Sequence, residues 1–159
     1  MKYEFVEGDT KVIAPGRTVK RIRALIAISY FASAGSLGGY IEDAKNLKQS
    51  GNAWVYGDAQ VYGNAQVYGD ARVCGDAQVY GDGLIVWFSH VGTENGTLTV
   101  YNTKDNSLEV IRGCFRGSID EFLTASENKH DDQTQLEYRM LIDVAYMRIT
   151  RAREKLGGV

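Results

Sequence analysis

The sequence has little of what several protein classes require. Its two cysteines, Cys74 and Cys114, lie far apart without a CxxC pair, which argues against a disulfide scaffold and against a zinc site. Its longest apolar runs, at 24–28 and 84–88, span about five residues, whereas a membrane-spanning helix needs about 20. Residues 1–11 contain three acids and lack the apolar segment of a signal peptide. We therefore expect a cytoplasmic protein without a membrane partner.

Neither sign of charge is in clear excess. Eighteen basic and 20 acidic side chains give a net charge of -2, so no overall field attracts nucleic acid, and nucleic acid is not an expected partner. The 159 residues suffice for one domain or two small ones, and 44% hydrophobic residues are enough for a core. The sequence has one proline, Pro15, but 18 glycines and ten tyrosines, a bias that indicates a repeat.

Six consecutive hexads follow Gly51 in the frame Gly-Asp/Asn-Ala-x-Val-Tyr. Ala and Val are two positions apart, so both side chains point to the same side of an extended strand, and we expect them to face inward. The intervening residue and the tyrosine should face outward, while Gly and Asp/Asn suit the turns. The hexads read GNAWVY, GDAQVY, GNAQVY, GDARVC, GDAQVY and GDGLIV.

These hexads resemble the hexapeptide-repeat family, whose members fold as left-handed parallel β-helices with three hexads per coil. The resemblance implies that residues 18 apart stack on neighbouring coils. It therefore predicts that Val55 stacks on Val73, Val61 on Val79 and Val67 on Ile85. On the outside it predicts that Trp54 meets Arg72 in a cation–π pair and that Tyr62 meets Tyr80.

The segment before the hexads carries a narrower resemblance. Residues 17–28 alternate in the manner of a strand. The order RIRAL, LGGYIE, NL and GNAWVYG, across Arg21 to Gly57, resembles small hexapeptide-repeat proteins of bacteriophages and prophages. The sequence departs from that pattern at 26–31, where the related proteins tend to be polar or acidic. Gly38, Gly39, Ile41 and Leu47 are expected to form an irregular first coil.

The segment after the hexads predicts a small α+β domain. Two β-rich runs, 96–103 and 107–112, flank a turn at Lys104-Asp105-Asn106. Ser118-x-x-Glu121 is a capping box, which predicts a helix from Ile119. A second helix is expected over 132–155. The turn, the Gly113-Cys114-Phe115-Arg116-Gly117 motif and the acidic helix start resemble the C-terminal domain that accompanies the same phage repeats.

The second predicted helix carries two apolar stripes, although a surface helix needs only one. We therefore expect one stripe to pack on the protein's own sheet and the other on a second subunit, in a homo-oligomer for which a trimer is favoured. One stripe contains Leu136, Met140, Val144 and Met147, and the other contains Tyr138, Ile142, Tyr146 and Ile149.

The fold class predicted from these patterns is mainly β: a left-handed parallel β-helix with a small C-terminal domain of a β-hairpin and two helices. The predicted divisions are a strand-rich segment at 1–33, the β-helix at 34–90 and the C-terminal domain at 91–159. Cys114 has two readings, a nucleophile activated by a nearby base or a small buried apolar residue. GxGxxG, GxxxxGK[ST] and HExxH motifs are absent from the sequence, so no cofactor or metal is expected.

The function favoured by these observations is binding without catalysis. Rows of tyrosines on a rigid face, with arginines beside glycines, suit an anionic aromatic ligand such as a nucleotide. By its resemblance to phage proteins, the protein is expected to sequester a host immune signal of that kind. The alternatives are an acyl-CoA-dependent acyltransferase, with His90 as its base, and an oligomeric scaffold without a ligand. The candidate ligand contacts are Lys104, Arg112, Cys114, Arg116 and His130.

Overall fold

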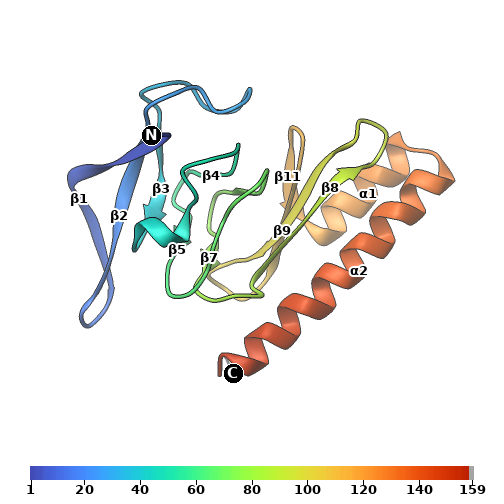
Figure 1. The fold of residues 1–159 in the computed structure, drawn as a ribbon. Coiled ribbons are helices and arrows are strands. Elements are labelled where there is room, and N and C mark those ends of the chain that lie inside the picture. The colour runs from blue at the N-terminus through green and yellow to red at the C-terminus, as the bar shows by residue number, and fades with distance from the viewer. Residues whose placement is uncertain (158–159) are drawn as a thin grey trace. The chain divides into compact units, whose positions relative to one another are not determined.

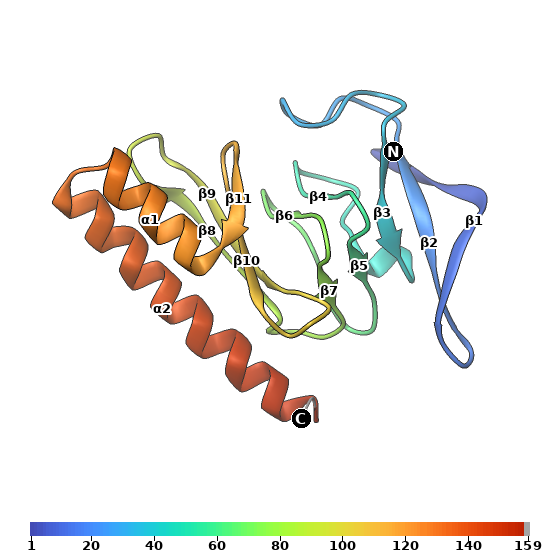
Figure 2. The same ribbon diagram turned by 180° about the vertical axis from the view of Figure 1, so that it is seen from behind.

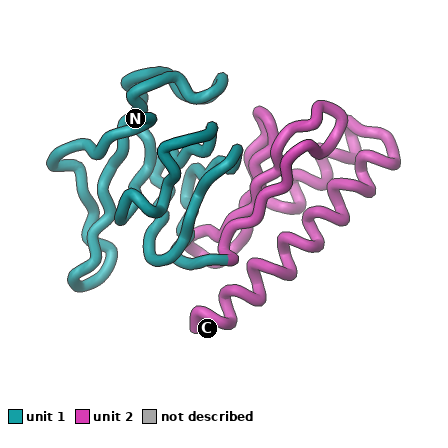
Figure 3. Tube along the Cα trace, viewed as in Figure 1, with its two compact units in different colours: residues 1–82 teal, residues 83–159 magenta. Residues whose placement is uncertain are grey.

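The computed structural model describes residues 1–157, which form two compact units. The first unit is Met1–Asp82 and the second begins at Gly83 (Figure 3). Each unit has its own sheets and its own buried residues. No helix among residues 1–157 is long and apolar enough to cross a membrane.

The first unit is built on a five-stranded mixed sheet in the order β1-β2-β3-β5-β7 (Figure 1). Strands β1, β2 and β3 pair antiparallel, and β3, β5 and β7 pair parallel. A separate two-stranded parallel sheet joins β4 to β6. The elements are β1 (Tyr3–Ala14), β2 (Arg17–Ala24), β3 (Leu37–Ile41), the 3-10 helix η1 (Ala44–Asn46), β4 (Trp54–Val55), β5 (Gln60–Val61), β6 (Arg72–Val73) and β7 (Gln78–Val79).

The predicted fold class, a left-handed β-helix, is wrong. Four of the six hexads form strands of only two residues, and these are divided between two small sheets, one of which continues into the antiparallel β1–β2 hairpin. The fold is therefore a mixed, sheet-rich one and not a solenoid. The parallel pairing stops at β3, because the other edge of β3 is taken by the antiparallel strand β2.

The predicted 18-residue register is confirmed within the first unit. Val55 pairs with Val73, and Val61 pairs with Val79. The Ala and Val positions of the first five hexads are all buried, at 0 to 1% exposure, which confirms their inward orientation. The stack of Val67 on Ile85 stays a prediction, because these residues belong to different units; Val67 bridges to Leu47, and Ile85 pairs with Tyr101 in the second unit.

Two side chains expected on the outside are buried. Trp54 is only 1% exposed, since the Tyr3 ring lies against it with 6.4 Å between ring centroids. Gly38 allows this packing, because a Cβ there would lie 2.8 Å from the Trp54 ring. Leu84 is fully buried in the second unit. Tyr62 and Tyr80 stack as predicted, at 5.7 Å between centroids.

The second unit is a four-stranded antiparallel sheet with two helices on one face (Figure 2). The predicted hairpin turn at 104–106 joins β9 to β10, and both helices begin where the sequence predicted. Ser118 caps α1 by accepting from the Glu121 amide, and Asp131 caps α2 by accepting from Thr134. The elements are β8 (Ile85–Val91), β9 (Gly96–Asn102), β10 (Leu108–Arg112), β11 (Phe115–Ser118), α1 (Ile119–Lys129) and α2 (Asp132–Lys155), with the strands in the order β11-β10-β9-β8.

Candidate functional site

Arg112, one of the predicted ligand contacts, ends β10 and points to α2. Its Nε donates a hydrogen bond of 3.0 Å to the Tyr138 hydroxyl, and Tyr138 is 1% exposed. Two glycines of the β8–β9 turn make room for this pair. A Cβ at Gly92 would overlap the Tyr138 hydroxyl, and a Cβ at Gly96 would lie 3.0 Å from the Arg112 guanidinium. The Gly92 amide also donates to Glu137 Oε1 at 2.7 Å, so Arg112 belongs to a contact that fastens the sheet to α2.

His130 lies against the same tyrosine. Its ring centroid is 5.6 Å from that of Tyr138, and its backbone carbonyl accepts from Gln135 Nε2 at 2.8 Å at the junction of the two helices. Tyr138 also meets Phe122, and Phe122 meets Phe115, at centroid distances of 5.0 and 5.3 Å. Arg112 and His130 therefore come together as predicted, but around a buried aromatic cluster.

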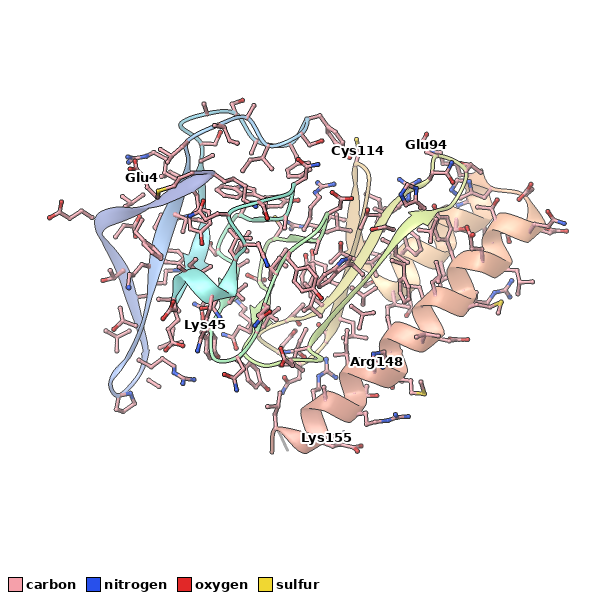
Figure 4. All side chains as sticks on the ribbon, viewed as in Figure 1. Glu4, Lys45, Glu94, Cys114, Arg148 and Lys155 are labelled. Atoms are coloured by element: carbon pink, nitrogen blue, oxygen red, sulfur yellow. The ribbon has the colours of Figure 1, made fainter. Side chains whose placement is uncertain are left out.

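Cys114 and Arg116 are not joined to that pair. Cys114 is exposed in the β10–β11 turn, at its tip in Figure 4, so the reading of Cys114 as a buried apolar residue is wrong. Arg116 Nε lies 2.8 Å from Glu109 Oε1. Because Glu109 and Arg112 are three positions apart on β10, their side chains leave opposite faces of the sheet. Arg116 and Arg112 thus point to different sides of the second unit.

Lys104 lies at the other end of the sheet. It is in the β9–β10 turn, where Thr103 and Ser107 donate to Asp105 and hold the pKa of that carboxyl below its usual range. Arg112 lies one whole strand away, at the opposite end of β10. His90, the candidate base of an acyltransferase, is exposed near the end of β8 and has a φ of 60°.

A second grouping, in the first unit, surrounds Arg72. Its guanidinium carbon lies 4.4 Å from the Phe31 ring centroid, 5.8 Å from that of Tyr30 and 5.9 Å from that of Tyr56. Arg72 Nη2 donates to the Tyr56 hydroxyl at 3.0 Å, and Nη1 to that of Tyr30 at 3.5 Å. We call Tyr30, Phe31, Tyr56 and Arg72 the Arg72 cluster.

The Arg72 cluster is open to solvent on one side. Tyr30 is 71% exposed, and Leu25 and Ile26 of the same loop are exposed too. On the inner side, burial raises the pKa of Tyr56, and its hydroxyl accepts from Arg72. The sequence pattern predicted a Trp54 partner for Arg72 and missed the loop rings. The only sign of these rings in the sequence was that residues 26–31 are apolar where the related phage proteins tend to be polar or acidic.

Two other tyrosines of the first unit, the buried Tyr40 and the half-buried Tyr62, also lie beside arginines. The Arg21 guanidinium lies 4.3 Å from the Tyr40 ring centroid, and Arg17 lies 5.6 Å from that of Tyr62. In both cases a carboxylate is part of the group. Asp9 binds Arg21 at 3.1 Å and accepts from the Tyr40 hydroxyl at 2.9 Å, while Glu42 lies 3.0 Å from Arg17. The Tyr40 hydrogen bond, followed by that from Arg21, lowers the pKa of Asp9.

Residues 1–157 contain no group of three or more His, Cys, Asp or Glu side chains that could hold a metal ion. A shallow cavity of about 40 Å³ lies between α1 and α2, lined by Leu123, Ser126, Glu127, Gln135 and Arg139. It has room for a few water molecules at most. The sequence matches no protein-family model, and no curated protein matches it.

Proposed function

We propose that this protein binds a small anionic ligand with an aromatic group, such as a nucleotide, and does so without catalysis. The observation that carries the proposal is the Arg72 cluster, in which a guanidinium lies among three aromatic rings and the Tyr30 ring is largely exposed. Arginine binds phosphate oxygens with paired hydrogen bonds, and an exposed tyrosine ring offers a stacking surface for a base.

The cluster is held ready for such a ligand. Arg72 is anchored on β6, whose partner strand β4 carries the buried Trp54. Tyr56 and Phe31 hold the guanidinium from the inside, so a ligand does not have to order a flexible side chain. A fixed arrangement of this kind lowers the entropic cost of binding. Base stacking contributes about 1–3 kcal/mol, and a charge-assisted hydrogen bond about 1.5–3 kcal/mol.

The biological setting is part of the same proposal. The resemblance to phage and prophage proteins favours the cytoplasm of a bacterial host, where a binding protein of this size could sequester a nucleotide signal. Sequestration requires affinity and no chemistry, which agrees with a cluster of arginine and aromatic side chains.

Thermal unfolding with a nucleotide panel tests the proposal. Linear and cyclic nucleotides are expected to raise the Tm, since a ligand at 100 times its Kd stabilises the folded state by about 2.7 kcal/mol. Inorganic phosphate has only the anionic part of a nucleotide, and adenosine has only the aromatic part. Each should therefore raise the Tm less than a nucleotide does. If the Tm stays the same with every nucleotide, the proposal is wrong.

Variants locate the site. Tyr30→Ala should weaken nucleotide binding about tenfold or more, because it removes an exposed stacking surface with little loss of packing. Arg72→Lys keeps the charge and should weaken binding through loss of the paired geometry. Tyr146→Ala, at a tyrosine of α2 that is 56% exposed, is the matched control. Arg112→Ala tests the site predicted from sequence, and loss of binding there alone would move the site to the second unit.

A further inference from the structure

We propose that the outer face of α2 pairs with the same face of a second copy of this chain, antiparallel and about a two-fold axis. This inference is independent of ligand binding by the first unit. We call the face formed by Leu136, Met140, Val144 and Met147 the outer stripe. Its four side chains are 53, 60, 41 and 46% exposed, respectively.

The outer stripe is not needed for folding of its own subunit. The helix is held to the second unit by the opposite side, where Tyr138, Ile142, Ala145 and Ile149 are at most 2% exposed. An amphipathic surface helix normally shows polar residues on the side away from its core. Here that side carries four apolar residues over three helical turns. Contiguous apolar patches of this kind are often functional.

The spacing of the stripe is self-complementary when two helices run antiparallel. With the two-fold axis beside Leu141 and Ile142, Leu136 of one copy lies opposite Met147 of the other, and Met140 lies opposite Val144. The steps of four, four and three residues amount to 11 residues in three turns. That period is close to the natural helical repeat, so two straight helices stay in contact along the stripe, about 17 Å in length.

The charges beside the stripe fit the same arrangement. Arg139 and Asp143 are both exposed and lie along one edge of the outer stripe. In the antiparallel pair each edge meets the same edge of the other copy, which brings Arg139 of each helix near Asp143 of the other. Figure 4 shows Arg148 on the same helix, beyond the stripe toward the C-terminal end. The two-fold pair therefore joins opposite charges at its centre.

The size of the surface predicts a weak pair. The four side chains expose on the order of a few hundred Å² on each copy, which equals the largest patch of a typical monomer. Pairing buries roughly twice that area, below the 1,200 Å² or more of stable complexes. We therefore expect a dissociation constant in the micromolar range, with monomers and pairs exchanging.

Sedimentation velocity of the full chain, from low micromolar to near-millimolar concentration, tests the pairing. The expected result is a concentration-dependent shift from one subunit to two. Met140→Asp should weaken association about 100-fold, because each pair contains the substitution twice at its centre. Val12→Asp changes an apolar residue that is 75% exposed on β1 and serves as the matched control. A chain that stays monomeric, or one that forms three subunits, would overturn the proposal.

The orientation has its own test, which does not depend on Met140→Asp folding well. In a Cys114→Ser background, chains with Leu136→Cys are mixed with chains with Met147→Cys and oxidised. The antiparallel pair predicts mixed disulfide dimers that join position 136 to 147. Leu136→Cys alone should not link to itself, since the two copies of position 136 lie about 17 Å apart along the antiparallel pair. Efficient self-linking through position 136 would instead show a parallel pair and would refute the antiparallel geometry.

Discussion

Lys2 is a buried basic residue whose ionisation should control the stability of the first unit. Its side chain is 2% exposed, and Nζ donates to the Ala53 carbonyl at 2.7 Å, with the Ser50 and Gly51 carbonyls at 3.5 Å. Loss of hydration lowers the pKa of Lys2 from 10.5 to about 8. Between pH 8 and pH 10.5, Lys2 therefore keeps its proton in the unfolded chain but has released it in the folded chain.

That difference makes the free energy of unfolding rise with pH. Stability increases with pH wherever the unfolded state binds more protons than the folded state. The gap between a pKa of about 8 and the usual 10.5 corresponds to about 3 kcal/mol in total, of which about 1 kcal/mol is regained between pH 7 and pH 9. Above pH 10 the direction reverses, because burial raises the pKa of Tyr3 to about 12 and only the unfolded chain then loses that proton.

Urea unfolding followed by Trp54 fluorescence measures this effect. A Trp87→Phe background leaves buried Trp54 as the reporter of the first unit. The wild-type free energy of unfolding should rise by about 1 kcal/mol from pH 7 to pH 9, and Lys2→Met should remove most of that slope. Lys48→Met, at an exposed lysine, is the control and should keep the slope. An equal slope in Lys2→Met and wild type would refute the reasoning.

Three substitutions test other parts of the fold. Val61→Ala should lower the free energy of unfolding of the first unit by about 2 kcal/mol, because it opens a cavity in a fully buried parallel pair; urea unfolding measures this. Ser118→Ala should cost about 1 kcal/mol through loss of the α1 cap, seen as a lower Tm by circular dichroism. Gly92→Ala should destabilise the second unit by about 1–3 kcal/mol, since φ is +74° and a Cβ would overlap the Tyr138 hydroxyl. Wild-type stability in any of these variants would contradict the contact it tests.

Local hydrogen-bonding patterns were readable from the sequence. Ser118 and Glu121 predicted the start of α1, because both halves of a capping box lie within four residues. The turn after β9 was equally predictable, since Asp105 and Asn106 are turn formers between two β-rich runs. The pairing of Val61 with Val79 followed from the period of three hexads per coil that the resemblance to hexapeptide repeats implied. The solenoid inferred from that period was wrong, because a shared register does not require continuous coils.

The candidate site depended on contacts between distant segments. Arg112 is bound by Tyr138, which lies 26 positions later, and no motif links the two. The rings of Tyr30 and Phe31 reach Arg72 from a loop some 40 residues earlier. Trp54 is buried because Tyr3 and Gly38 close over it. Such contacts bring residues together through the fold, so spacing along the chain does not reveal them.

The sequence by itself determined the hexad period, the inward Ala and Val positions, the hairpin and the start of both helices, because each follows from side-chain alternation or from hydrogen bonds within a few residues. Only the tertiary structure decided which stripe of α2 faces the sheet. Both stripes are apolar at helical spacing, so the sequence pattern does not distinguish the stripe that packs on the sheet from the other one. Packing selected the stripe with Tyr138 and Ile142, because the tyrosine hydroxyl meets Arg112 there, and it left Met140 and its neighbours facing outward.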